Sequence, residues 1–77
     1  MHELAITESL VDCVVEHIGD ARALRVVVEI GKRSGVLSDA IRSCFALCAE
    51  GTPLEGADLE IVEPPDDALR ILEVEVI

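Results

Sequence analysis

The sequence predicts an α+β fold of two layers, in which two helices pack on one face of a three-stranded mixed sheet in the order α-β-α-β-β. Two segments repeat apolar residues at three- and four-residue steps, which is typical of amphipathic helices. Three other segments alternate apolar and charged residues, which is typical of half-buried strands. The 77 residues are 51% hydrophobic and fall short of the usual ~100–150 residues of a domain, so a single domain over residues 1–77 is expected.

The first helix is predicted over residues 3–18. Glu3 lies in its first turn, where a carboxylate interacts favourably with the helix dipole, and His17 lies near its end, where an imidazolium would do the same. Gly19 is expected to end the helix, because glycine readily adopts the left-handed C′ conformation. The apolar stripe that should face the core consists of Ile6, Leu10, Cys13, Val14 and Ile18.

The first strand is predicted over residues 24–30 and the second helix over residues 38–50. Val27 falls on the outer, charged face of that strand. Ser38 is expected to be the N-cap of the helix, and Gly51 to close it. The residues expected on the inner face of the strand are Leu24, Val26, Val28 and Ile30.

The second and third strands are predicted over residues 57–62 and about 69–76, separated by a turn at 63–68. Two prolines and three acids cannot lie inside a sheet, so this segment must reverse the chain. The first two strands, joined through a helix, can be parallel, and the turn then makes the sheet mixed. Ile71 falls on the outer face, where it and Val27 are either tolerated surface residues or a dimer patch. The residues expected to face inward are Ala57, Leu59, Ile61, Leu72, Val74 and Val76.

Composition and charge exclude several functional classes. Sixteen acidic and six basic residues give a net charge of −10, and aromatic residues make up 1%, so nucleic-acid binding is not expected. No apolar run approaches the ~20 residues of a membrane-spanning helix. The start Met1-His2-Glu3 is not the basic region of a signal peptide, and three cysteines do not make a closed disulfide framework. We therefore expect a protein of the reducing cytoplasm.

The first three residues carry the most informative chemistry. The α-amine of Met1, the deprotonated backbone amide of His2 and its imidazole can form fused chelate rings around one metal ion. Planar nitrogen coordination suits Ni(II) or Cu(II). A fourth donor would be the Glu3 amide, the Glu3 carboxylate or water. The alternative is that the histidine occupies the second position by chance.

Other candidate groups are better explained by structural roles than by a metal-binding or catalytic site. Cys44 and Cys48 share one helix face and could bind a soft metal, but a free cysteine more often packs as a small apolar group. The sequence has no Cys-x-x-Cys, so it encodes no structural zinc site. Gly31-Lys32-Arg33-Ser34 resembles the end of a phosphate loop, but Val26 occupies the position of the required first glycine. No Ser/His/Asp set stands out, so an enzyme is not expected.

Several segments in one register resemble a known family over residues 1–62, and again in the last strand. They are Met1-His2-Glu3-Leu4-Ala5-Ile6, Arg25-Val26-Val27-Val28-Glu29-Ile30-Gly31, Ser34-Gly35-Val36, Phe45-x-Leu47-Cys48-x-Glu50-Gly51-Thr52, Ala57-x-Leu59-Glu60-Ile61, Leu69-Arg70-Ile71 and Glu73-Val74-Glu75. The ordered set is similar to the HypA/HybF family of hydrogenase-maturation nickel chaperones.

This resemblance implies cytoplasmic delivery of Ni(II), as transient cargo, during assembly of [NiFe]-hydrogenase, with urease a second client in some bacteria. It implies a HypB-like GTPase and the hydrogenase large subunit as partners. It also implies a nickel site at Met1, His2 and Glu3, in which His2 is the anchoring side chain. Some members place a further acidic residue before the second helix. The matching position here is Leu37, with Asp39 two residues on.

The family inserts a zinc domain with two Cys-x-x-Cys pairs before its last strand, where this chain has only residues 63–68. No zinc is therefore expected, whether the domain is naturally absent or has been removed. A rival interpretation is a zinc-less interaction module that docks a GTPase or hydrogenase partner without delivering metal. The sequence predicts either a monomer or a dimer. If the short 63–68 turn is too tight to close within one chain, the last strand would be swapped between two chains.

Overall fold

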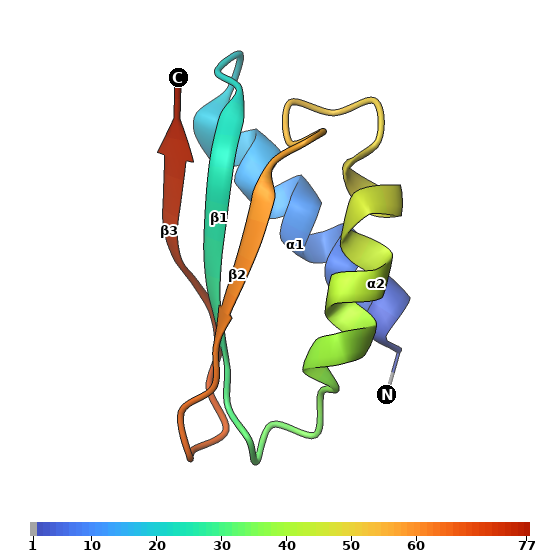
Figure 1. The fold of residues 1–77 in the computed structure, drawn as a ribbon, viewed down its shortest axis with the longest axis vertical. Coiled ribbons are helices and arrows are strands. Elements are labelled where there is room, and N and C mark those ends of the chain that lie inside the picture. Colours follow the sequence, from blue (N-terminus) through green and yellow to red (C-terminus); the bar gives the residue numbers. More distant parts are fainter. Residues whose placement is uncertain (1) are drawn as a thin grey trace.

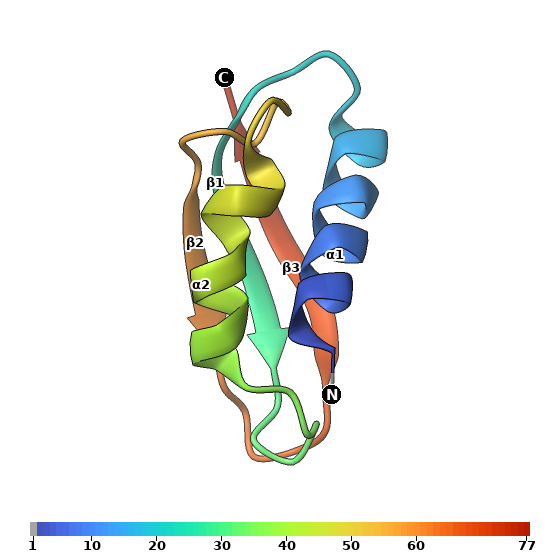
Figure 2. The same cartoon turned by 90° about the vertical axis from the view of Figure 1, so that its right-hand side faces the viewer.

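The computed structural model describes residues 2–77, which fold into a layer of helices and a layer of strands (Figure 1). Both helices cover the same face of the sheet, and both begin at the same end of the molecule (Figures 1 and 2). The predicted fold class and element order are confirmed. The elements are α1 (Glu3–Ile18), β1 (Ala23–Ile30), α2 (Ser38–Ala49), β2 (Asp58–Val62) and β3 (Leu69–Val76).

The central strand of the sheet is β1, which lies between β2 and β3. It pairs with β2 in parallel and with β3 in antiparallel orientation, so the sheet is mixed as predicted. The predicted bounds of the elements agree with the structure to within about one residue. The N–H of Gly19 donates to the carbonyl oxygen of Val15, which confirms that Gly19 ends α1. Its φ of 61° and ψ of −123° are not the expected left-handed conformation but one that is also open to glycine.

A bulge in β3 changes which of its residues face the helices. Val26 lies opposite Val74, but Val28 lies opposite Ile71, so Leu72 is an extra residue in the ladder. Ile71 therefore packs against the core, whereas Leu72 is 47% exposed. The predicted outward position of Ile71 and inward position of Leu72 are both wrong, because one extra residue inverts the alternation beyond it.

A second register shift affects the start of β1. Ala23 pairs with Val76 and Arg25 with Glu75, so Leu24 is the extra residue there. Ala23 is buried in the core, and Leu24 is 46% exposed. The prediction that Leu24 faces inward is therefore wrong for the same reason as that for Leu72.

The outer face of the sheet carries a charged network above one apolar residue. Val27 lies between Glu60 on β2 and Glu73 on β3 in the two ladders. The Arg25 guanidinium pairs with both carboxylates, at 2.9 Å from Glu60 and 3.3 Å from Glu73. Val27 is only 6% exposed, so the prediction of a surface residue or dimer patch at this position is wrong.

The core lies between the sheet and the two helices. Leu54, in the connection after α2, is fully buried in it, and Phe45 supplies the one aromatic side chain of the sequence. No helix among residues 2–77 is long and apolar enough to span a bilayer. The core residues that the helices and β1 contribute are Val11, Val14, Ala23, Val26, Val28, Ile30, Ile41, Phe45 and Ala49.

The connection 63–68 joins β2 to β3 within one chain and contacts the loop that follows β1. The N–H groups of Gly31, Lys32 and Arg33 donate to carbonyl oxygens of this connection, at 2.7, 2.8 and 2.9 Å. A Cβ atom on Gly31 would lie 2.1 Å from the carbonyl oxygen of Asp66. Glycine is therefore required at this position because the two backbones approach so closely.

Candidate metal-binding site

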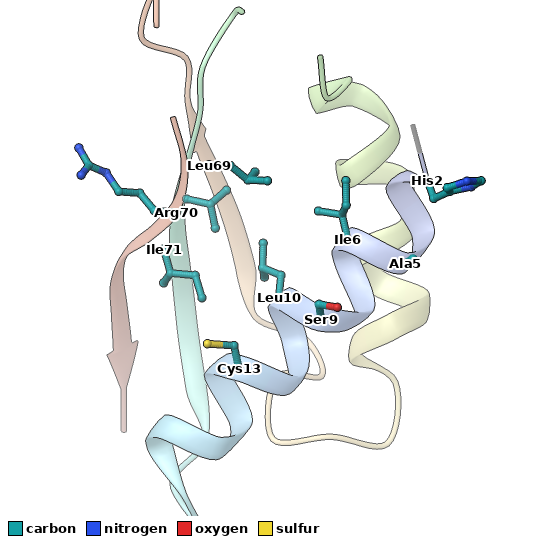
Figure 3. A pocket seen from close by; sticks show the side chains of 10 residues that line it. His2, Ala5, Ile6, Ser9, Leu10, Cys13, Leu69, Arg70 and Ile71 are labelled. Atoms are coloured by element: carbon teal, nitrogen blue, oxygen red, sulfur yellow. The ribbon is translucent and has the colours of Figure 1, made fainter. Parts of the chain in front are cut away.

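Of the residues predicted to bind nickel, His2 and Glu3 lie where α1 begins. His2 is exposed and directly precedes the helix, and its carbonyl oxygen accepts the N–H of Ile6 at 3.0 Å. Met1, the predicted amine donor, lies outside the described residues. The His2 imidazole points away from β3 and into solvent (Figure 3), so it is accessible to a metal ion.

Glu3, the first residue of α1, uses its side chain in a contact with the other helix. Its Oε2 atom accepts the backbone N–H of Leu37 at 3.1 Å. This hydrogen bond lowers the pKa of the Glu3 carboxyl below its ordinary value and outweighs the opposite effect of desolvation. The carboxylate of this candidate ligand is therefore already engaged in the metal-free protein.

The contact corrects the predicted capping of α2. Leu37, not Ser38, is the N-cap residue, and no side chain of its own caps the helix. Ser38 is the first helical residue, so the predicted N-cap at Ser38 is wrong. Glu3 instead reaches Leu37 across 34 positions of sequence. The positive ends of two helices thus meet at one carboxylate, which is the charge they favour.

Neighbouring polar side chains fix the backbone on both sides of this contact. The buried Thr7 hydroxyl donates to the carbonyl oxygen of Glu3 at 2.7 Å. On the loop side, Ser34 Oγ accepts the N–H of Val36 at 3.1 Å. The first turn of α1 and the residues before α2 are therefore held in place independently of any metal.

The matching position for a further acidic ligand also lies at this end of the molecule. Leu37 contributes its N–H to the Glu3 contact, and its side chain is 67% exposed. Asp39 lies in the first turn of α2, where its carboxylate is 3.9 Å from the Arg42 guanidinium. The structure thus brings His2, Glu3 and Leu37 together at the helix starts, with Asp39 in the adjacent turn.

Nitrogen donors are available at this end of the chain. His2 supplies an imidazole, and the Glu3 amide is one of the first N–H groups of α1, which have no acceptor within the helix. Successive backbone nitrogens beside an imidazole favour a square-planar metal such as Ni(II) or Cu(II). Among residues 2–77, no three or more His, Cys, Asp or Glu side chains are grouped so that they could hold a metal ion.

The three cysteines lie away from the amino terminus. Cys44 and Cys48 are half-buried on α2, and Cys48 packs against the core, as the apolar interpretation predicts. Desolvation raises the pKa of the Cys48 thiol, with smaller contributions from Glu8, Cys44 and Asp12. Cys13 is exposed, so its predicted place on the inner stripe of α1 is wrong.

An apolar groove of about 610 Å³ runs between α1 and β3 beside this site. Leu10, Leu69 and Ile71 point into it, whereas Arg70 points to the outer face (Figure 3) and pairs with Glu29 at 2.6 Å. The groove therefore offers mainly hydrocarbon. The residues that line it are His2, Ala5, Ile6, Ser9, Leu10, Cys13, Val28, Leu69, Arg70 and Ile71.

The fold and the exposed nitrogen donors at the start of α1 define a small α+β domain with a candidate metal site at its amino terminus. A family model described as "Hydrogenase/urease nickel incorporation, metallochaperone, hypA" matches residues 1–69. The chain belongs to the HypA family, which confirms the resemblance seen in the sequence.

Individual relatives agree with this assignment. The chain is 54% identical over 65 residues to the hydrogenase maturation factor HypA of Nostoc punctiforme, covering 84% of this chain and 58% of that protein. Identity to the HypA of Geobacter metallireducens is 48% over 65 residues, covering 84% of this chain and 59% of the relative. The chain thus spans somewhat more than half the length of these curated relatives.

A solved structure shares the fold. The solution structure of the Ni metallochaperone HypA from Helicobacter pylori superimposes with a TM-score of 0.86 at 23% sequence identity. The match covers 100% of this chain and 98% of that one. At this identity the likeness concerns the arrangement of helices and strands.

Proposed function

We propose that this chain is a nickel-binding metallochaperone core that carries Ni(II), as transient cargo, to [NiFe]-hydrogenase during its maturation. The observation that carries the proposal is the family match over residues 1–69, which includes the Met1-His2-Glu3 start. The exposed His2 imidazole beside the first amides of α1 gives that start a suitable donor set.

His2 is the anchoring ligand in this proposal, Met1 supplies its α-amine, and Glu3 supplies its amide or its carboxylate. Amine, amide and imidazole nitrogens must all be deprotonated to bind a metal. Nickel loading should therefore release protons, and the nickel affinity should increase with pH.

A HypB-like GTPase and the hydrogenase large subunit are the proposed partners, in the cytoplasm, and urease is proposed as a second client. The curated relatives are named hydrogenase maturation factors, and the family description mentions both hydrogenase and urease. The chain acts as a carrier, not an enzyme. An interaction module without metal delivery is less well supported, because the family description specifies nickel incorporation.

Zinc has no role in the proposed nickel binding. The cysteines lie on α1 and α2, and the sequence contains no Cys-x-x-Cys pair, so the residues present do not fit the family's zinc domain. Residues 63–68 connect β2 to β3 where that domain is expected. Treatment with a zinc chelator, followed by its removal, should therefore leave both the melting temperature and the nickel affinity of this chain unchanged.

Isothermal titration of Ni(II) into protein with an unmodified amino terminus tests the proposal. His2→Ala should weaken binding by about 100-fold or more, which corresponds to about 2.7 kcal/mol. His17→Ala is the matched control, because His17 lies in the last turn of α1, at the far end of the helix. Equal affinities of the His2→Ala variant and the original protein would refute the proposed site.

A further inference from the structure

The Glu3 side chain could serve a nickel site in two ways. Its carboxylate could bind the metal directly, or its hydrogen bond to Leu37 could hold the amino terminus in position. Oε2 of Glu3 lies 3.1 Å from the Leu37 nitrogen, and this N–H belongs to the N-cap residue of α2. Donors at a helix start have no acceptor within the helix, so the side chain of Glu3 fills a role that no backbone group of α2 can fill.

The surroundings favour the second role. Glu3 opens α1 and contacts the start of α2, so two helix dipoles attract its negative charge to its present position. Its carbonyl oxygen is fixed separately by the buried Thr7 hydroxyl at 2.7 Å. To bind a metal through Oε2, the carboxylate would have to give up the Leu37 N–H, whereas the Glu3 amide has no acceptor within the helix.

We propose that Glu3 is a positioning residue of the nickel site, whose carboxylate stays on the Leu37 N–H while nickel binds to the nitrogen atoms of the amino terminus. The contact fixes the first turn of α1 against α2 and thereby holds the His2 and Glu3 backbone where it can chelate. Any donor atom from Glu3 is its amide nitrogen. This inference rests on the proposed function and specifies how its site is held.

Four variants separate the two roles in nickel titrations. Glu3→Ala removes the acceptor and should weaken binding about tenfold, while Glu3→Gln keeps an acceptor oxygen and should recover most of that loss. Leu37→Pro removes the donor and should also weaken binding. Leu37 has a φ of −87°, near that of proline, and a side chain that is 67% exposed. Leu37→Ala keeps the N–H and controls for the lost side chain.

Two additional readouts distinguish positioning from ligation. The double variant Glu3→Ala/Leu37→Pro should bind nickel no more weakly than either single variant, because both remove the same contact. The Leu37 amide should exchange its hydrogen as slowly in the nickel-loaded protein as in the metal-free protein. The visible spectrum of the nickel complex should be the same for Glu3→Gln as for the original protein. Glu8→Gln, an exposed acid further along α1, controls for the change of charge.

The results that would overturn the inference are specific. If Glu3→Gln loses as much affinity as Glu3→Ala, the carboxylate is a ligand, whatever the effect of Leu37→Pro. If every Glu3 and Leu37 variant binds like the original protein, Glu3 has no role. In both cases binding that still depends on His2 leaves the proposed function intact. Should Leu37→Pro fail to fold, the pair Glu3→Ala and Glu3→Gln still decides the question.

Discussion

The loop between β1 and α2 is held at its two ends in different ways. At its start, Gly31, Lys32 and Arg33 donate three backbone hydrogen bonds to the 63–68 connection. At its end, one side chain, Glu3, accepts the N–H of Leu37. The first attachment depends on close backbone packing and the second on a single charge. The comparison teaches that the fold is secured at the backbone attachment, whereas the side-chain attachment positions the start of α1 against the start of α2.

The largest expected effect is at the backbone attachment. Gly31→Ala would place a Cβ atom 2.1 Å from the Asp66 carbonyl oxygen, so one backbone must move and lose its hydrogen bonds. We expect a loss of about 3 kcal/mol of unfolding free energy, measured by urea denaturation. Gly19→Ala is the matched control. It meets no atom within 4 Å, so only its own backbone conformation is strained, and it should cost less, about 2 kcal/mol. Equal losses in the two variants would show that the close approach is unimportant.

A smaller effect is expected at the side-chain attachment. Glu3→Ala removes the acceptor for the Leu37 N–H and should lower the melting temperature by roughly 4 °C. Ser38→Ala should change the melting temperature far less, because Ser38 is the first helical residue and not the cap. Calorimetry of both variants decides whether Glu3, as the structure shows, or Ser38, as the sequence predicts, supplies the cap of α2. A larger effect for Ser38→Ala would favour Ser38.

The smallest effect is the pH dependence of this attachment. The hydrogen bond from Leu37 holds the pKa of the Glu3 carboxyl below its unfolded value. The corresponding stability is complete above the unfolded pKa, near 4.5, and is lost as the pH falls through the lower, folded pKa. The difference in melting temperature between the original protein and Glu3→Ala should therefore shrink on acidification. A difference that stays constant down to pH 2 would contradict the assigned contact.

Most of the fold could be predicted because its signals are local. The three- and four-residue spacing of α1 and the alternation in β1 and β2 lie within short windows. The bulge in β3 could not be predicted, since Leu72, Val74 and Val76 continue an alternation that fits a regular strand. Only the pairing of Val28 with Ile71 reveals that the alternation changes face.

Of the candidate site, too, one part could be predicted from the sequence and another could not. His2 could be selected because its chemistry depends only on its position next to the amino terminus. The contact of Glu3 with Leu37 could not be predicted from the sequence, because it joins residues 34 positions apart. Its donor is a backbone N–H, which every residue except proline has, so the residue type at position 37 does not indicate it. The acid in the first turn of α1 suggested a role within its own helix, whereas the structure shows that it also caps the neighbouring one.

Nickel titration of the chain with a free and with an acetylated α-amine tests the central claim most directly. Acetylation removes one nitrogen donor and leaves every side chain unchanged. The account predicts that the free form binds one Ni(II) with release of protons, and that the acetylated form loses this binding although its fold and melting temperature are retained. Equal nickel affinity of the two forms would contradict a site built on the amino terminus.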